Sequence, residues 1–323
     1  MEKPFISVIV TAYNRKQFIL EALNSIINQT LSRDKYEVIV TKNFEDKDID
    51  KFISDNDMKN ILFTEPGIGP RLADAIKVCQ GDVITFLEDD DIWSKDRLER
   101  VYNVFKNYDV GFYHNTGIHN KLDEDYSGLV KQLGVTDQDN YKIIDYPYKE
   151  KAYLNNLGNN SSIAVAKDTV IKYLDKIYIC ELSVDLFLLL IVFIEKVRLF
   201  IDFNSLTFIR VHKRGRTLEE EIKYEGRSLK DLFDGFNLAK TYNSTSGVGI
   251  TKRQIFLLIT WRGMLKNESR AAIIKDAIKF FPGFKFVNKP FIKRAGLFFI
   301  YLIIPRYANA MVIKRLKIAG QII

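Results

Sequence analysis

Residues 82–93, with the sequence DVITFLEDDDIW, decide how the rest of the chain is interpreted. Within them, Val83–Leu87 is a short β-branched and apolar run that follows Gly81 and has the composition of a strand buried on both faces. Four carboxylates, Glu88–Asp91, come directly after it. Close carboxylates repel one another by roughly 1 kcal/mol per pair in water and by ~4 kcal/mol at the effective dielectric of a protein surface. We therefore expect a cation at this strand end.

The acidic run has two interpretations. In the first it is a turn that leads into a helix, with Asp91 or Ser94 as the N-terminal cap. That interpretation uses only one or two of the four acids. In the second the carboxylates bind a divalent cation, because oxygen ligands suit Mg²⁺ or Mn²⁺ and these ions commonly accompany the phosphates of a substrate. We favour the second interpretation because it accounts for more of the acids.

Earlier apolar runs have the same character as the strand at 83–87. They are Phe5–Thr11, Tyr36–Thr41 and Ile61–Phe63. Segments with helical periodicity separate them, at residues 18–27, 50–59 and 72–79. Alternating strands and helices predict a doubly wound, parallel α/β sheet whose ligands bind at the carboxyl ends of the strands. The turn after Thr11, the segment after Thr41 and the acidic run are expected at that edge.

Composition sets broad limits on the class of protein. With 323 residues, 47% of them hydrophobic and 28% charged, the chain has room for one large α/β domain with an appendage, or for two domains. Its two cysteines have neither disulfide-framework nor zinc-site spacing, which fits a reducing compartment. No signal-peptide pattern opens the chain, and no apolar run reaches the ~20 residues of a spanning helix. We expect a cytoplasmic protein.

Four motifs in this order resemble the family 2 glycosyltransferases, an inverting group with the A-type nucleotide-sugar transferase fold. They are SVIVTAYNR at 7–15, EVIV at 37–40, a Gly-rich loop that ends at Arg71, and GDVITFLEDDDIW at 81–93. The resemblance is good over residues 4–105 and looser as far as 217. It implies a Rossmann-like mixed sheet flanked by helices. We expect a catalytic domain at 1–218 and a mainly helical, basic and aromatic region at 219–323.

The resemblance also implies a nucleoside-diphosphate sugar donor, with UDP favoured, and Mn²⁺ or Mg²⁺ as the cofactor. Glu88 and Asp90 align with the two acids of the family's metal motif, with Asp91 behind them. The donor site implied in this way consists of Thr11, Ala12, Tyr13, Asn14, Asn43, Arg71, Glu88, Asp89 and Arg216. The metal ligands implied are Asp90, Glu88 and His212, the last from a basic segment that resembles the family's late histidine segment.

One departure from the family lies after the EVIV motif. The family usually has two aspartates there, one of which contacts uracil, whereas this chain has Lys42 and Asn43. The amide of Asn43 can donate to a ring carbonyl and accept from a ring N–H, so it is able to take over base recognition. Guanine and other bases therefore stay open beside uracil.

Two further segments resemble the acceptor and catalytic parts of the family. The GNNSS sequence at 158–162 resembles the loop of the acceptor pocket, so Asn159, Asn160 and Ser161 are acceptor-binding candidates. A helix expected at 181–194 carries Asp185, which aligns best with the catalytic base, and Glu181 is the alternative. Acids at a helix N-terminus are also favoured by the helix dipole alone.

The C-terminal region is basic and aromatic. Residues 277–323 hold nine lysines and arginines and no acidic residue. Helices are expected at 219–239, 253–265 and 270–281, with a flexible linker at 242–249. The last of these helices is amphipathic, and its expected apolar face consists of Ala271, Ile274, Ala277, Ile278 and Phe281. Anionic lipid would attract these cations while the aromatic groups enter the headgroup layer, so we favour a membrane surface over an ordinary helical subdomain. Nucleic acid comes third, and we expect none as a partner.

Together these observations predict an inverting glycosyltransferase of the hexosyltransferase type. Its expected acceptor is a lipid-linked sugar or other surface-glycan precursor at the cytoplasmic face of a membrane. Two other classes of protein stay open: a sugar nucleotidyltransferase, which also combines an α/β sheet with carboxylate-bound Mg²⁺, and a non-catalytic protein that binds nucleotide sugars.

Overall fold

The structure is a computed structural model that describes residues 3–65, 67–121, 133–148, 157–211, 217–266, 268–281 and 289–318. The chain divides into two compact units. The first consists of Met1–Lys149, Leu157–Cys180 and Val184–Val211. The second consists of Glu150–Asn156, Glu181–Ser183 and His212–Ile323.

The first unit begins with four parallel strands. These are β1 (Ile6–Ala12), β2 (Tyr36–Lys42), β3 (Lys59–Leu62) and β4 (Val83–Glu88), in the spatial order β3-β2-β1-β4. Every residue of β1 and β4 except Thr11 and Glu88 is a buried apolar or small side chain, as expected for strands covered on both faces. The register places Thr11 opposite both Thr41 and Glu88. The carboxyl ends of these strands therefore meet at one edge, as the sequence predicts.

Helices connect these strands at the predicted places, with shifted bounds. They are α1 (Lys16–Ile27), α2 (Lys47–Asp55) and α3 (Ile68–Val78). Helix α1 buries Ile19, Ala22, Leu23 and Ile26, the spacing of one helical face. Helix α2 begins earlier than its apolar periodicity predicts because the side chain of Asp46 caps it, accepting the N–H of Ile49 at 3.3 Å.

The second half of the sheet makes it mixed. Its strands are β5 (Ile92–Trp93), β6 (Phe112–Lys121), β7 (Tyr141–Ile144), β8 (Ile163–Ala166) and β9 (Leu199–Val211). Strand β8 is antiparallel to β4 and β6, and the long β9 pairs with β6 in parallel and with β5 and β7 antiparallel. Within the described residues this gives a sheet of nine strands. The predicted mixed α/β sheet is confirmed.

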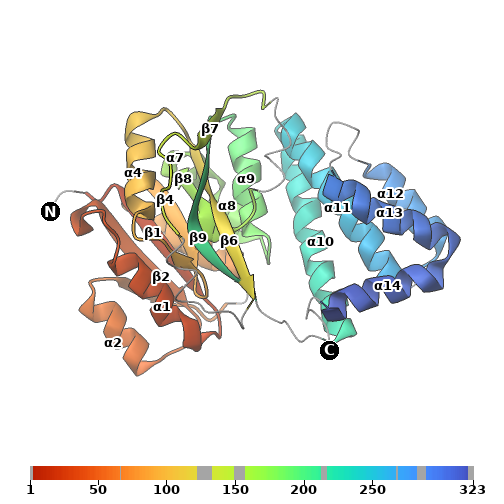
Figure 1. Cartoon of the computed structure of the whole chain (residues 1–323), viewed down its shortest axis with the longest axis horizontal. Coiled ribbons are helices and arrows are strands. Elements are labelled where there is room, and N and C mark those ends of the chain that lie inside the picture. Colours follow the sequence, from red (N-terminus) through yellow and green to blue (C-terminus); the bar gives the residue numbers. More distant parts are fainter. Residues whose placement is uncertain are drawn as a thin grey trace. The chain divides into compact units, whose positions relative to one another are not determined.

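Helices cover the sheet of the first unit, among them α4 (Arg97–Asn107), α7 (Lys167–Val170), α8 (Leu174–Tyr178) and α9 (Val184–Ile194) (Figure 1). Helix α9 begins at Val184 and not at Glu181, so the expected helix starts three residues later than its acidic end suggests. Every residue of α9 except Asp185 is buried. One carboxylate thus stands at the start of an otherwise apolar helix.

Most of the described part of the second unit is helical. Its helices are α10 (Leu218–Thr241), α11 (Thr245–Lys266), α12 (Arg270–Lys279), α13 (Lys289–Ile303) and α14 (Pro305–Ile318) (Figure 1). Aromatic contacts form part of its core, such as Phe256 against Phe291 and Phe298. None of the described helices has the combination of length and apolarity needed to cross a bilayer.

Two expectations about this unit are wrong. The linker expected at 242–249 is helical from Thr245 onward, because Ser246, Gly247 and Gly249 are buried small residues of α11, which packs beside α10. The expected apolar face of α12 is also displaced. This helix buries Ile273 and Ala277, while Ile278 is 73% exposed.

Candidate active site

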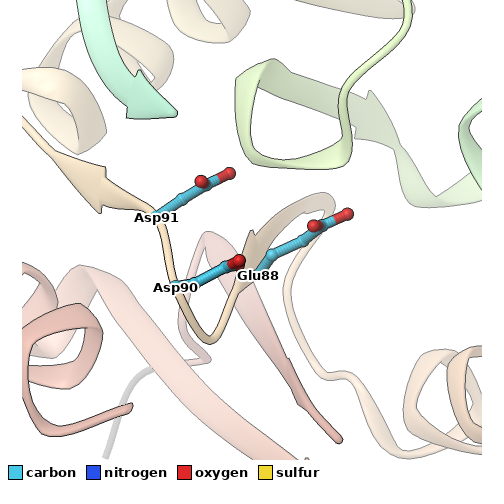
Figure 2. A group of neighbouring side chains, drawn as sticks. All are labelled: Glu88, Asp90 and Asp91. Carbon is cyan, nitrogen blue, oxygen red and sulfur yellow. The ribbon is translucent and has the colours of Figure 1, made fainter. Parts of the chain in front are cut away.

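The acidic run lies where β4 ends and turns into β5. Glu88 is the last residue of β4, and oxygen atoms of Glu88, Asp90 and Asp91 all lie within 4.8 Å of one another. Figure 2 shows the three side chains extending to the same side of this turn. Three carboxylates that converge in this way form a candidate site for a divalent cation. Asp91, expected behind the metal ligands, belongs to this group.

The helix that follows does not use these acids as caps. Helix α4 begins at Arg97, and its N-cap residue is Asp96. The interpretation of Asp91 or Ser94 as a cap of this helix is therefore wrong. Asp91 instead accepts the backbone N–H of Arg210 in β9 at 3.1 Å, while its buried Oδ2 has no hydrogen-bond partner among the described residues.

A cation of the chain itself enters the cluster. Arg15, in the turn between β1 and α1, pairs with Asp89 Oδ1 at 2.7 Å and also with Asp90. Burial lowers the pKa of Arg15, but the four carboxylates outweigh it and the pKa is raised. The sequence alone does not predict this role for Arg15. The only signal for it was its position at the end of the SVIVTAYNR motif.

Arg15 does not neutralise the whole cluster. Burial and the charge of Asp90 raise the pKa of Glu88 to about 7, against the opposing effect of Arg15. Burial also raises the pKa of Asp89 to about 7, and burial with the neighbouring charges of Glu88 and Asp90 raises the pKa of Asp91 well above its usual value. A cation bound beside these carboxylates would stabilise their charged forms.

Strand β9 also contacts the acidic turn, through its residue Arg210. Besides the bond from its N–H to Asp91, Arg210 donates its Nε to the carbonyl of Asp90 at 3.1 Å. Its guanidinium also pairs with Glu21 at 2.7 Å and lies 4.3 Å from the centre of the Phe18 ring. The described contacts of Arg210 therefore fix the turn.

The candidate nucleoside side lies at the ends of β1 and β2. Tyr13 is 48% exposed, its N–H donates to Asp89 Oδ2 at 3.0 Å, and the Arg71 guanidinium lies 4.8 Å from its ring centre. Arg71 is itself held by the carbonyls of Gly67 and Ala12, at 2.9 and 3.3 Å. Thr11 accepts the N–H of Asp89 at 3.2 Å. The turn after β1 is thus tied directly to the acidic turn after β4.

The departure at Lys42 and Asn43 has a structural explanation. Lys42 is buried and pairs with Asp50 at 2.8 Å, so it serves the packing of α2 against β2. Asn43 exchanges two hydrogen bonds with Asn14: its Oδ1 accepts the Asn14 N–H at 3.0 Å, and its amide donates to Asn14 Oδ1 at 2.9 Å. The two amides form a polar pair beside Tyr13.

The loop at 157–162 joins the acidic cluster to Asp185. Asn160 donates its side-chain amide to Glu88 at 3.4 Å, and the hydroxyl of Ser161 accepts the N–H of Glu88 at 3.0 Å. Asn159 donates its N–H to Asp185 Oδ2 at 3.2 Å. Asp185 is also close enough to Glu88 to contribute to its raised pKa. Ser161 is fully buried, so its described contacts are made within the protein.

Glu181, the alternative base, has a different environment. Its carboxylate pairs with Arg227 at 2.7 Å and Lys230 at 3.1 Å, both on α10. Hydrogen bonds from these two cations lower the pKa of Glu181. A carboxylate stabilised in its charged form is a weaker proton acceptor. His212 and Arg216, the other predicted metal and donor residues, lie outside the described residues.

Comparison with known proteins adds independent information. The family model "Glycosyl transferase family 2" matches residues 7–172, about half of the chain. A poly(ribitol-phosphate) beta-glucosyltransferase of Bacillus spizizenii is 32% identical over 111 residues, 31% of this chain and 17% of the relative. The putative teichuronic acid biosynthesis glycosyltransferase TuaG of Bacillus subtilis is 29% identical over 104 residues, 30% of this chain and 40% of the relative. The chain thus covers less than half of these relatives.

Solved structures share the fold. S. aureus TarS 1–349 in complex with UDP-GlcNAc has a TM-score of 0.53 at 13% identity, covering 85% of this chain and 90% of the other. The mannosyltransferase PcManGT from Pyrobaculum calidifontis, in complex with GDP-Man and Mn²⁺, has a TM-score of 0.54 at 16% identity, covering 96% and 88%. At these identities the likeness shows the fold alone.

Proposed function

Because the chain belongs to glycosyl transferase family 2, we propose that it moves a sugar from a nucleoside-diphosphate sugar to an acceptor hydroxyl with inversion at the anomeric carbon. The observation that carries this proposal is the convergence of Glu88, Asp90 and Asp91 beside the loop that contacts Asp185. This arrangement places a cation site close to a candidate catalytic base.

The donor set of this chain supports a divalent metal as the cofactor. Glu88, Asp90 and Asp91 would hold it, since their oxygens converge and Oδ2 of Asp91 is buried without a hydrogen-bond partner among the described residues. Such a metal, Mn²⁺ or Mg²⁺, supplies positive charge beside the departing diphosphate. Arg15, which pairs with Asp89 and Asp90, balances part of the negative charge of the acidic run.

Tyr13 and its neighbours support a nucleoside site. An exposed ring that is backed by the Arg71 guanidinium offers a flat surface on which a nucleobase stacks. The paired amides of Asn14 and Asn43 lie next to it and can donate to and accept from the edge of a base. The family resemblance favours UDP, whereas the absence of the usual carboxylates at 42 and 43 leaves guanine open, so we propose UDP as the first donor to test and GDP as the second.

The proposed reaction is a single displacement. The acceptor oxygen forms a bond to the anomeric carbon while the bond to the diphosphate oxygen breaks, and that oxygen keeps the electron pair. Asp185 takes the acceptor proton. Asn159 and Asn160 would orient the acceptor, and the N–H of Asn159 holds the carboxylate of Asp185 in place. The acceptor we propose is a lipid-linked or surface-glycan precursor, reached at the cytoplasmic face of a membrane.

Calorimetric titration tests the proposed donor site. UDP, GDP and TDP are added to the whole chain with and without Mn²⁺, and we expect at least one to bind more tightly with the metal. If none binds in a metal-dependent way, the proposal fails. Incubation with a nucleoside triphosphate and a sugar phosphate is the matched control, because pyrophosphate release would identify a nucleotidyltransferase instead.

Helix α13 supports the proposed membrane surface. Ile292, Phe299 and Ile303 lie on one helical face and are 59, 62 and 77% exposed, while Phe291, Phe298 and Tyr301 on the other side are buried. The described part of α14 exposes Arg306, Lys314 and Lys317, and the chain has no acidic residue after Asp276. An apolar face among unopposed cations fits an anionic lipid surface.

We expect the chain to sediment with vesicles of phosphatidylglycerol and phosphatidylcholine, and more weakly with phosphatidylcholine alone. Changing Ile292, Phe299 and Ile303 together to serine should release it, because that removes the apolar face. Ile278→Ser, on an equally exposed isoleucine of α12, is the control and should bind as the unchanged chain does. Sedimentation of the triple variant at the original level would rule out this face. If the unchanged chain is a dimer in solution and the triple variant is a monomer, a second copy of the chain covers this face instead of lipid.

A further inference from the structure

A buried carboxylate on α10 holds the backbone in front of helix α9. Asp231 is fully buried. Its two oxygens accept the N–H groups of three successive residues: Glu181 at 2.9 Å, Leu182 at 2.7 Å and Ser183 at 2.9 Å. Three N–H groups that converge on one carboxylate fix the direction of that backbone segment, because each bond constrains a different peptide plane.

Residues 181–183 lead directly into helix α9, which carries the candidate base, Asp185. Residues 181–183 belong to the second unit, and the chain continues from Ser183 into α9, whose second residue is Asp185. The same helix, α10, also binds the side chain of Glu181 through Arg227 and Lys230. Helix α10 thus binds residues 181–183 through their backbone N–H groups and through the side chain of Glu181.

We propose that Asp231 is a positioning residue that sets the orientation of the Asp185 carboxylate. This inference rests on the proposed role of Asp185 as the base. Asp185 stands in the first turn of α9, so a rotation of the preceding peptides moves its carboxylate directly. Proton transfer needs the base within hydrogen-bond reach of the acceptor hydroxyl, and a displacement of about 1 Å can cost about 100-fold in rate.

The substitution Asp231→Asn tests this role. The amide keeps the size of the side chain but turns an NH₂ group toward N–H donors, so it cannot accept all three bonds. We expect Asp231→Asn to lower kcat by about 10- to 100-fold. Binding of the nucleoside diphosphate should stay unchanged, since β1, β2 and β4 form that site. Asp231→Glu, which keeps the carboxylate, should recover most of the rate.

The assay uses the full chain and needs no glycan acceptor. It follows release of the nucleoside diphosphate from UDP-GlcNAc or GDP-Man, whichever diphosphate binds in the titration, with water as the acceptor. Asp234→Asn is the matched control, because Asp234 lies on the same helix, is half-buried and pairs only loosely with Lys230 at 3.6 Å. Its rate should equal that of the unchanged chain.

A second readout reports on the segment itself. Amide hydrogen exchange at 181–185 should be slow in the unchanged chain and faster in Asp231→Asn. If Asp231→Asn does not fold, Ser183→Pro decides instead. It removes one of the three donors at the residue that directly precedes α9, and it should lower kcat with donor binding intact.

The outcomes separate this inference from the proposed function. If Asp185→Asn abolishes turnover while Asp231→Asn, or Ser183→Pro in its place, folds and turns over at the full rate, the positioning role of Asp231 is wrong and Asp185 stays the base. If Asp185→Asn itself keeps the full rate, the proposed base is wrong, whatever the Asp231 variants do.

Discussion

Replacing Asp185 with asparagine is expected to lower the turnover of sugar transfer by about 100-fold or more and to leave donor binding intact. The amide has the shape of the carboxylate but cannot take the acceptor proton. Asp185 is the one residue of α9 that is not buried, so the change leaves the apolar packing of the helix in place. Release of the nucleoside diphosphate from the sugar nucleotide measures turnover, and calorimetry measures donor binding.

Two variants serve as controls for this experiment. Asp168→Asn removes an exposed carboxylate from the neighbouring helix α7 and should change neither quantity. Glu181→Gln tests the alternative base, and we expect it to keep most of the activity because Glu181 is already paired with Arg227 and Lys230. Full activity in Asp185→Asn together with loss of activity in Glu181→Gln would transfer the role of base to Glu181.

The second large effect is expected from Asp90→Asn. This change removes one of three converging carboxylates and should weaken Mn²⁺-dependent donor binding by more than about 100-fold, because even the outer contacts of metal ligands are worth 10- to 100-fold. Titration of the nucleoside diphosphate with and without Mn²⁺ measures the loss. Binding without the metal should change little.

Asp82→Asn is the matched control for Asp90→Asn. Asp82 precedes the same strand, β4, but lies at its opposite end and is exposed, and its side chain pairs with Lys3. Its donor affinity should equal that of the unchanged chain, and thermal unfolding of both variants confirms that the fold is kept. An unaltered Mn²⁺-dependent affinity in Asp90→Asn would remove Asp90 from the metal ligands.

The sequence was sufficient for the strands that build the site. The apolar runs at 5–11, 36–41 and 83–87 are continuous because both faces of these strands are buried, so their composition alone identifies them. In a parallel arrangement their carboxyl ends must meet at one edge. The acidic run, Tyr13 and Asn43 were therefore brought to one edge by local pattern and topology.

Helix bounds and helix faces in the C-terminal region were less predictable. Ser246, Gly247 and Gly249 look like part of a loop, yet they belong to α11, since small side chains also allow a helix to pack closely against its neighbour. The buried face of α12 was likewise misjudged at Ile278. In both places the sequence is compatible with more than one helix start or buried helix face, and tertiary packing decides between them.

The sequence by itself determined the family, the mixed α/β fold and the acidic strand end, because these follow from local composition and the order of the motifs. Only the tertiary structure placed Arg15 among the carboxylates, separated Asp185 from Glu181 by their surroundings, and brought Asp231 to the backbone in front of α9. Each of these contacts joins residues far apart in the chain. Charge and hydrogen bonding act over a few ångströms in space, so no spacing in the sequence encodes them.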